Sequence, residues 1–288
     1  MDNIIVSICC ITYNHEPYIR ECLDGFMMQE CDFAFEVLIH DDASTDSTQD
    51  IIREYQEKYP DIIKPIIQTE NQYSKGIRTI QSTYNFSRAK GKYIALCEGD
   101  DYWTDPFKLQ KQVDFLEANP DCSVCFHAAR HQRADNPSNY HIHRPKNIPL
   151  DNKFGIKDVI LGGGGFMTTN SMIMKKEVIE TERPQWMNGV PVGDLPLSLF
   201  LGVKGEIGYI DEVMSVYRLF SSNHSWSSSM QDAEREKIHF YRIIKMWKEF
   251  DAWTEFKYHS TVRKKINLNR KNYFKQRLKR IINAFFKG

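Results

Sequence analysis

The stretch from Gly91 to Pro106 constrains the fold of this 288-residue chain more than any other part of it. Its residues 93–97 are an apolar run, which predicts a short buried strand. Three carboxylates follow within four residues, at Glu98, Asp100 and Asp101. Carboxylates this close repel one another unless a cation offsets their charge. A capping side chain and a proline then predict a helix start, so the acids occupy a turn between a strand and a helix.

Strand-like and helix-like segments alternate along residues 1–130. Apolar runs predict strands at 4–12, 35–40, 62–67, 93–97 and 123–129. Apolar residues at helical spacing predict helices at 16–28, 77–89 and 106–119. A further helix, with Ile51, Ile52 and Tyr55 on one face, is predicted to end at Tyr59. This order predicts an α/β fold with a mostly parallel, Rossmann-like sheet and helices on both faces. The carboxyl ends of the strands then meet at one edge, where ligands bind.

Polar turns follow three of the predicted strands and should therefore lie together. The dipeptide Tyr13-Asn14 follows the first strand, Asp41-Asp42 ends the second, and the acidic turn ends the fourth. We expect Gly99 to give the acidic turn its backbone freedom. A single acidic turn could be no more than a solvated helix cap. Two acidic turns at one edge favour a cation-assisted site for a polyphosphate or a nucleotide.

The pattern changes after residue 130. Residues 133–154 are polar, contain three prolines and predict a long loop. His141 and His143 in this segment could bind a metal ion, but a solvated loop is the favoured interpretation. The run Gly162–Gly165 lacks the Lys-Ser/Thr ending of a phosphate-binding loop, so we expect a hinge or a close-approach loop there.

The chain is long enough for one large domain or two small ones. With 41% hydrophobic residues, it can bury a full core. We expect one domain at residues 1–228 with halves 1–130 and 131–228, followed by a helical, basic extension at residues 229–288. Two further short strands are expected in the second half, at 207–210 and 213–217.

Seven cysteines are scattered through the predicted elements, which suits buried free thiols in a reducing compartment. Cys122 and Cys125 have no second pair at metal-binding spacing, so packing within a strand is favoured for them. We recognise no signal peptide and no membrane-spanning run, and we expect a cytoplasmic location.

The C-terminal segment 257–288 is strongly basic. It contains eleven Lys or Arg and no Asp or Glu, although the whole chain has a formal net charge of zero. Phe274, Leu278 and Ile282 are among the apolar residues interleaved with these bases. The segment suits a helix on an anionic membrane surface, and equally a helix packed on the catalytic domain with a solvated basic face. Nucleic acid is not expected as a partner, because no recognition motif accompanies the charge.

Three segments, in this order and spacing, resemble glycosyltransferase family 2. They are Val6-Ser-Ile-Cys-Cys-Ile-Thr-Tyr-Asn-His-Glu, Glu36-Val-Leu-Ile-His-Asp-Asp-Ala-Ser-Thr-Asp and Gly91-Lys-Tyr-Ile-Ala-Leu-Cys-Glu-Gly-Asp-Asp. The resemblance covers residues 4–226 and implies the GT-A fold. It also implies transfer of a sugar, with inversion, from a nucleotide-diphosphate sugar to a hydroxyl acceptor. Bacterial surface polysaccharide or lipopolysaccharide synthesis is the pathway expected from the family.

The resemblance implies roles for particular residues. Those expected to contact the nucleotide sugar are Thr12, Tyr13, Asn14, Glu16, Asp41, Asp42, Glu98 and Asp100. One of the pair Asp41 and Asp42 would bind the base, and the other could merely cap the next helix. The family's D-x-D element is matched by Glu98-Gly-Asp100, and its unusual Glu leaves the division of roles among the three acids open. Asp100 and Asp101 are expected to bind Mg²⁺ or Mn²⁺, which take oxygen ligands.

Inverting members of the family use a carboxylate at the start of a later helix as the general base. Asp194 matches that position, just before a helix expected at 195–201, and its alternative role is a helix cap. The family often places a His or an Arg of a C-terminal loop over the diphosphate. His224 and Arg218 are the candidates, and His224 is also a candidate metal ligand.

Two rival functions stay open. A sugar nucleotidyltransferase shares the sheet but carries a glycine-rich, basic first loop, whereas residues 13–17 contain no Gly, Lys or Arg. A non-catalytic nucleotide-sugar-binding module would keep the fold without the chemistry, and the retained carboxylates argue against it. The expected partners are a nucleotide-diphosphate sugar donor and a glycan or lipid-linked glycan acceptor. If the basic tail binds a membrane, the protein would be peripheral on the inner face of the cell membrane.

Overall fold

The computed structural model describes residues 3–188, 190, 193–221, 228, 230 and 232–285. Its sheet has the strand order β3-β2-β1-β4-β9-β6-β10-β5, with β7 paired to β6 and β8 paired to β10. The strands are β1 (Ile4–Thr12), β2 (Ala34–Asp41), β3 (Ile63–Ile67), β4 (Tyr93–Glu98), β5 (Tyr102–Trp103), β6 (Cys122–Arg133), β7 (Tyr140–His143), β8 (Lys153–Phe154), β9 (Ile173–Lys175) and β10 (Glu206–Leu219). The helices are α1 (Ile19–Met27), α2 (Thr48–Lys58), α3 (Lys108–Ala118), α4 (Ile156–Gly162), α5 (Lys176–Ile179), α6 (Asp194–Lys204), α8 (Ala233–Trp253) and α9 (His259–Phe285), with shorter turns η1 (Gln81–Asn85), η2 (Phe86–Arg88), η3 (Gly163–Gly165), η4 (Thr169–Ser171) and η5 (Gln185–Met187).

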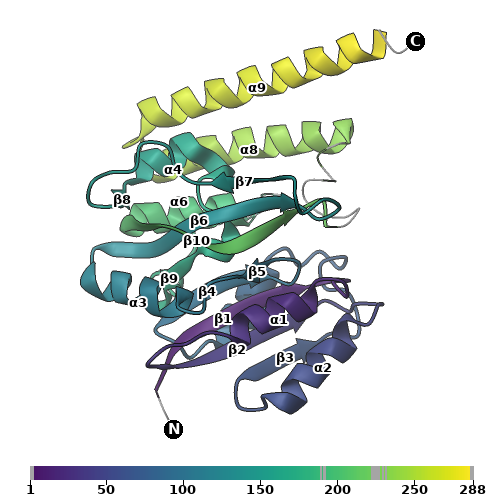
Figure 1. Ribbon diagram of the computed structural model, residues 1–288. Helices are drawn as coiled ribbons and strands as arrows, with labels where there is room; N and C mark the ends of the chain where they lie inside the picture. The colour runs from purple at the N-terminus through teal and green to yellow at the C-terminus, as the bar shows by residue number, and fades with distance from the viewer. Residues whose placement is uncertain are drawn as a thin grey trace.

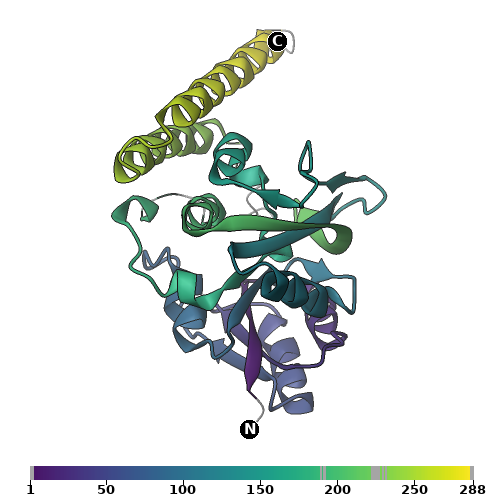
Figure 2. The same ribbon diagram turned by 90° about the vertical axis from the view of Figure 1, so that its left-hand side faces the viewer.

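Strand β1 runs between two hydrophobic cores, one on each face of the sheet. Ile8 and Cys10 belong to the core that α1, α2 and α3 cover, whereas Cys9 belongs to the core beneath α4, α6 and α8. Neighbouring side chains of a strand point to opposite faces, so a strand covered on both sides is apolar throughout. The predicted α/β fold, with helices flanking the sheet, is therefore confirmed (Figures 1 and 2).

The segment 77–89, predicted as a helix, contains no α-helix. It forms the π-helical turn η1 and the 3-10 turn η2. The amide of Gln81 donates a hydrogen bond to the carbonyl of Cys9 at 3.1 Å, and that of Asn85 donates to the carbonyl of Cys10 at 2.9 Å. Polar side chains that bind the backbone of β1 fix this segment, whereas the prediction considered only its apolar residues. The predicted helix was therefore wrong.

The polar segment 133–154 is not the long loop that the sequence predicted. Strand β7 within it pairs with β6 as an antiparallel hairpin, which places His141 opposite His131. Ile142 packs against the core on the side of α4 and α6. Cross-strand pairing with a strand that precedes the segment therefore orders residues whose own composition indicated solvation.

Strand β10 joins two segments that were predicted as separate strands, 207–210 and 213–217. Its register with β6 shifts between Ile210 and Val213 and again before Ser215. Such irregularities interrupt the alternation of buried and exposed side chains. The sequence pattern therefore predicted two short strands where the structure has one. Strand β10 pairs in parallel with β6 along most of its length, and the C-terminal helices α8 and α9 follow it in the chain (Figure 1).

The helices α8 and α9 form the predicted helical C-terminal extension, at the end of the molecule far from β3 (Figures 1 and 2). Val262 and Tyr273 of α9 are buried, and Phe240 of α8 stacks on Tyr273 with ring centroids 4.1 Å apart. The side chains of Phe274 and Leu278 are 61% and 58% exposed. The helix α9 is thus packed along one side and presents apolar and basic residues on another. Among the described helices, none is long and apolar enough to cross a bilayer.

Candidate active site

The carboxyl ends of β1, β2 and β4 meet at one edge of the sheet, as the sequence predicted. Thr12 of β1 pairs with Asp41 of β2, and Ile11 pairs with Glu98 of β4. Because all three strands run in parallel, the turns that follow them lie side by side. We call this region the sheet edge, comprising residues 12–16, 41–42 and 98–101.

Hydrogen bonds hold the turn after β1 against the turn after β2. Asn14, in the left-handed region with φ 53°, accepts a hydrogen bond from the backbone N of Thr45 at 2.8 Å. Glu16 accepts one from the backbone N of Ser47 at 3.1 Å. The side chain of Tyr13 is 39% exposed at this edge. Asn14 and Glu16 therefore shape the wall of the site, and the ring of Tyr13 is the accessible group.

Both carboxylates at the end of β2 are buried and engaged by the protein itself. Asp41 accepts hydrogen bonds from the backbone N and the hydroxyl of Ser44, and from the amide of Gln49 at 2.7 Å. Asp42 accepts hydrogen bonds from two successive backbone N–H groups, at residues 72 and 73, at 2.7 and 3.0 Å. These contacts fix the loops that flank the sheet edge, and the predicted contact of either acid with a nucleotide base stays a prediction.

Asp100 and Asp101 lie in different environments. Asp101 is buried, and its Oδ1 accepts a hydrogen bond from the backbone N of Arg218 at 2.8 Å. The side chain of Asp100 keeps 15% exposure, and its Oδ2 lies 3.9 Å from Nε2 of His15. The same oxygen accepts a hydrogen bond from the hydroxyl of Ser221 at 2.6 Å. Asp101 is therefore the anchored carboxylate of the two, and Asp100 is the one that faces outward.

Gly99 permits close packing rather than an unusual backbone conformation. A Cβ atom there would lie 2.7 Å from Oγ1 of Thr12 and 3.0 Å from Nδ1 of His15. The described glycines in the left-handed region are Gly76 and Gly163, so the backbone freedom expected at Gly99 was the wrong explanation. The missing side chain instead lets the acidic turn touch the end of β1.

The charges of the acidic turn and of Asp194 act on one another. Burial, with smaller contributions from the carboxylates of Asp100 and Asp194, raises the pKa of Glu98 to about 8. Burial also raises the pKa of Asp101 well above its ordinary value, with Asp100 the next cause. Carboxylates from two distant parts of the chain, Asp100 and Asp194, therefore both disfavour the ionisation of Glu98.

The acidic turn has the ligand atoms that a hard divalent cation needs. Oδ2 of Asp101 and Oγ1 of Thr12 are buried, and within the described part of the chain neither has a hydrogen-bond partner. Carboxylate and hydroxyl oxygens are ligands that Mg²⁺ and Mn²⁺ prefer. Asp100 and Asp101, the ligands predicted from the resemblance, thus fit such an ion. His224, the third candidate, lies outside the described residues.

Arg218 of β10 stabilises the acidic turn by binding its backbone. Its guanidinium donates a hydrogen bond to the carbonyl of Asp100 at 2.6 Å and forms an ion pair with Glu21 of α1. It also lies over the rings of Tyr18 and Tyr102, 4.9 and 4.4 Å from their centroids. These contacts give Arg218 a structural role that the sequence did not indicate, and its predicted contact with a diphosphate stays a prediction.

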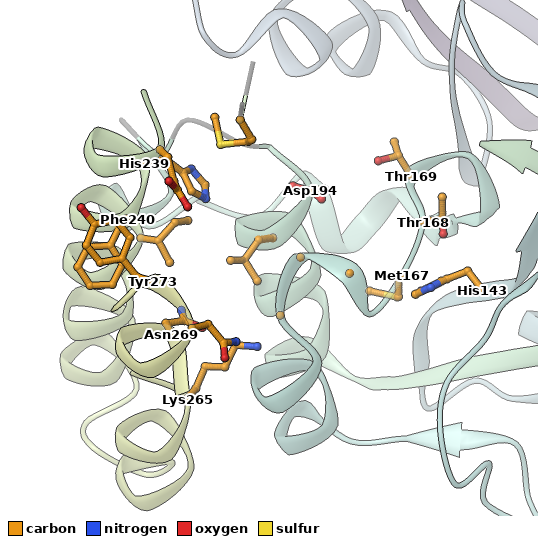
Figure 3. A pocket seen from close by; sticks show the side chains of 18 of the residues that line it. His143, Met167, Thr168, Thr169, Asp194, His239, Phe240, Lys265, Asn269 and Tyr273 are labelled. Carbon is orange, nitrogen blue, oxygen red and sulfur yellow. The ribbon is translucent and has the colours of Figure 1, made fainter. Parts of the chain in front are cut away.

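Asp194 is the first residue of α6 and lines a cavity of about 580 Å³ (Figure 3). The cavity lies between the sheet and the helices α8 and α9. A Cβ atom on Gly164 would lie 3.6 Å from Oδ2 of Asp194, so the glycine turn η3 forms the adjoining wall. Burial raises the pKa of Asp194, and hydrogen bonds from its own backbone N–H and that of Leu195 oppose the shift. The carboxylate therefore lines the cavity and is close enough to the acidic turn for its charge to act on Glu98.

The C-terminal helices give the cavity a polar wall with an aromatic patch. Asn269 and Tyr273 of α9 lie opposite Asp194 in Figure 3, beside the stacked ring of Phe240. The ammonium of Lys265 donates a hydrogen bond to the carbonyl of Leu161 at 2.8 Å, and burial lowers its pKa to about 8. The extension is thus part of the site, which its charge pattern in the sequence did not indicate.

Tyr217 of β10 is a site residue that sequence reasoning missed. It lines the cavity together with Asp194. Burial raises the pKa of its hydroxyl, and the carboxylates of Glu98, Asp101, Asp100 and Asp194 add to the rise. The hydroxyl therefore lies within the field of all four acids and stays protonated. A tyrosine inside an ordinary strand pattern gives no signal of this position.

Comparison with known proteins identifies the family. The model of "Glycosyl transferase family 2" matches residues 7–182, which is more than half of the chain. The chain belongs to glycosyltransferase family 2. The resemblance read from the three sequence segments is confirmed.

Relatives from two bacteria align with most of the chain. An uncharacterized protein of Mycobacterium tuberculosis is 38% identical over 238 residues, which cover 80% of this chain and 63% of that protein. The chain therefore spans less than two thirds of the length of this relative. The putative teichuronic acid biosynthesis glycosyltransferase TuaG of Bacillus subtilis is 29% identical over 242 residues, which cover 83% of this chain and 88% of that protein.

Solved structures share the fold at low sequence identity. Staphylococcus aureus TarS 1-349 in complex with UDP-GlcNAc has a TM-score of 0.59 and 17% identity, covering 85% of this chain and 66% of that one. The mannosyltransferase PcManGT from Pyrobaculum calidifontis, in complex with GDP-Man and Mn²⁺, has a TM-score of 0.56 and 18% identity, covering 92% and 72%. These likenesses confirm the predicted GT-A fold.

Proposed function

We propose that this protein is an inverting, metal-dependent glycosyltransferase that uses a nucleotide-diphosphate sugar. The position of Asp194 carries the proposal. Its charge acts on Glu98 of the sheet edge, and its side chain lines the cavity. The sheet edge would bind the donor and the cavity would bind the acceptor, so Asp194 stands where the reacting atoms would meet.

The donor would lie along the carboxyl ends of β1 and β2, with its diphosphate at the acidic turn. The exposed ring of Tyr13 is available to stack on the base. A divalent cation held by Asp100 and Asp101 would offset the negative charge that builds on the departing diphosphate. PcManGT, which contains Mn²⁺ together with GDP-Man, supports this arrangement by analogy of fold.

Asp194 would act as the general base. The acceptor oxygen forms a bond to the anomeric carbon of the sugar and passes its proton to the carboxylate of Asp194. The bond from that carbon to the diphosphate oxygen breaks, and its electron pair leaves with the nucleoside diphosphate. A single displacement of this kind inverts the anomeric centre. Burial raises the pKa of Asp194, which makes its carboxylate a stronger base than an exposed one.

The chemistry of the cavity favours a glycan as the acceptor. Asn269 and Gln276 offer amides, and the stacked pair Phe240 and Tyr273 offers an apolar surface. Sugars combine hydroxyl groups with apolar ring faces, so such a lining suits them. The name of TuaG connects that relative with the biosynthesis of teichuronic acid. We infer that the acceptor is a surface polysaccharide or its lipid-linked precursor.

The helix α9 is suited to bring the protein to an anionic membrane where a lipid-linked acceptor would reside. Phe274 and Leu278, four residues apart, are exposed on α9, as is Ile282 one turn further on. Lysine and arginine residues surround them. Exchanging Phe274 and Leu278 for Ser should weaken binding to anionic vesicles, while binding to neutral vesicles serves as the control. Unchanged binding to anionic vesicles would leave α9 with its packing role alone.

The nucleotidyltransferase alternative is less well supported. The first turn, residues 13–17, is tied to the next turn by Asn14 and Glu16 and contains no Gly, Lys or Arg to hold a triphosphate. A non-catalytic binding module has no use for a carboxylate at the junction of sheet edge and cavity. Product analysis with a nucleotide-diphosphate sugar separates these alternatives.

The exchange Asp194→Asn tests the proposal. It keeps the shape of the side chain and removes the base, so turnover should fall by about 10²- to 10⁴-fold. Binding of the nucleotide should stay nearly unchanged. Asp50→Asn, at the start of the exposed helix α2, is the matched control and should keep full turnover. Turnover equal to that of the unmodified protein would remove Asp194 from the mechanism, and loss of nucleotide binding would make it a structural residue.

A further inference from the structure

Three histidines lie together on one face of the β6–β7 hairpin, outside the acidic turn. His131 of β6 pairs with His141 of β7, and His143 follows two positions later on the same strand. Residues paired across strands, and residues two apart along a strand, point to the same face. One ligand nitrogen from each of the three rings lies within 4.8 Å of the others. The structure thus gathers three imidazoles where the sequence predicted a solvated loop.

The three rings lie close to one another, and two of them are shifted toward the neutral form. The rings of His131 and His143 are stacked, with centroids 4.5 Å apart, and the ring of His141 is 5.2 Å from that of His131. Burial, with smaller contributions from His143 and His141 because like charges would repel, lowers the pKa of His131 to about 3. Burial also lowers the pKa of His143. Neutral imidazole is the form that binds a metal ion.

We propose that His131, His141 and His143 form a binding site for a transition-metal ion of the zinc class, separate from the acidic turn. Imidazole nitrogens suit Zn²⁺, Co²⁺, Ni²⁺ and Cu²⁺, whereas carboxylates suit Mg²⁺ and Mn²⁺. Three histidines leave one position of a tetrahedral ion open. The protein would therefore hold two kinds of ion, a hard cation at the sheet edge and a softer one on the hairpin.

The surroundings of the cluster fit this ligand set. Nε2 of His131 lies 3.0 Å from Oγ1 of Thr168, a hydrogen bond that orients the ring and leaves Nδ1 for a metal ion. Around zinc, with Zn–N distances near 2.0–2.1 Å, ligand nitrogens lie about 3.3 Å apart. The ligand nitrogens, which lie within 4.8 Å of one another, must therefore approach by at most about 1.5 Å. The side chain of His141 is exposed and can rotate without disturbing the core. Rotation of His141 can therefore supply part of this approach.

The site would connect the hairpin to the cavity. His131 and His143 both line the cavity, and Figure 3 shows His143 beside Met167 on the side away from α9. The ring of His131 also packs against Tyr217, with centroids 5.0 Å apart. A bound ion would fix β7 to β6 next to the tyrosine that lies among the four carboxylates. Its expected effect is to stabilise the hairpin and this wall of the cavity.

Zinc titration of the full chain, prepared without a histidine tag and stripped with a chelator, tests the site. Competition with a chromogenic zinc indicator gives the stoichiometry and affinity, and Co²⁺ substitution gives a visible spectrum that reports the ligand geometry. We expect one tight zinc ion per chain. His141→Asn removes a ligand at an exposed position. Changing a residue that merely supports a metal ligand lowers metal affinity by about 10- to 100-fold. The loss of zinc affinity in His141→Asn should be larger than that. His143→Asn should do the same.

Two control variants make the outcome decisive. His259→Asn changes a histidine at the start of α9 and keeps a hydrogen-bonding side chain for Asp251, and Asp100→Asn alters the acidic turn. Both should bind zinc as the unmodified protein does. Equal zinc affinity in His141→Asn and in the unmodified protein would overturn the proposal, as would loss of tight zinc binding in Asp100→Asn. Because this outcome involves neither donor nor acceptor, it is independent of the proposed transfer reaction.

Discussion

The sheet edge and the cavity are built in different ways. The edge consists of turns that directly follow strands, and Asp41, Asp42 and Asp101 are held there by the protein's own hydrogen bonds. The cavity is assembled from β6, α6, β10, α8 and α9, which are far apart in the sequence. Under the proposed function, the sheet edge would hold a diphosphate and its cation with carboxylates that the protein fixes in place. The cavity would receive an acceptor that has to enter and leave.

The exchange Arg218→Met should have the largest effect on this contrast. It removes the guanidinium that braces the carbonyl of Asp100 and pairs with Glu21. The free energy of unfolding should fall by about 2–3 kcal/mol, because a buried polar group loses its partner. Nucleotide binding should weaken with it. Arg53→Met, on the exposed face of α2, is the matched control and should change stability by less than about 0.5 kcal/mol. If chemical denaturation shows equal effects, the edge does not depend on this brace.

The exchange Asn269→Ala should have a smaller effect, confined to the cavity. Loss of one hydrogen bond to an acceptor costs about 0.5–1.5 kcal/mol, so the KM for the acceptor should rise by about 2- to 13-fold. Stabilisation by the donor nucleotide should not change. Asn267→Ala, an exposed position on the same helix that does not line the cavity, is the control. A rise in the KM for the donor instead would contradict the separation of the two half-sites.

The third prediction is a pH dependence of stability. The pKa of Glu98, raised to about 8 in the folded protein, lies above its ordinary value in the unfolded chain. Between these two values the folded state binds more protons, so the free energy of unfolding should fall as the pH rises. Glu98→Gln should flatten this dependence, whereas Glu57→Gln, at an exposed position on α2, should not. Added Mn²⁺ should also flatten it. Thermal unfolding at several pH values without metal checks the sign, and a rise in stability over this range would contradict it.

Much of the sheet edge could be predicted, because its information is local. An apolar run followed by Glu98 and Asp100 identifies a strand and its acidic turn. Parallel pairing of that strand with β1 then places the turn beside the end of β1. The start of α6 at Asp194 was also predicted. The cavity was not, since it depends on how α8 and α9 dock and on the shifted register of β10, which brings Tyr217 to the site. The clustering of His131 with β7 likewise depends on pairing that polar composition does not reveal.

The most direct test of the central claim is thermal unfolding with a panel of nucleoside diphosphates, each with and without Mn²⁺. A ligand at 100 times its dissociation constant should add about 2.7 kcal/mol to the free energy of unfolding. We predict a metal-dependent rise with one nucleotide, which Asp100→Asn abolishes and Asp194→Asn retains. This result would place the donor at the sheet edge and Asp194 at the junction with the cavity. No stabilisation of the folded protein by any of the nucleotides would contradict the account.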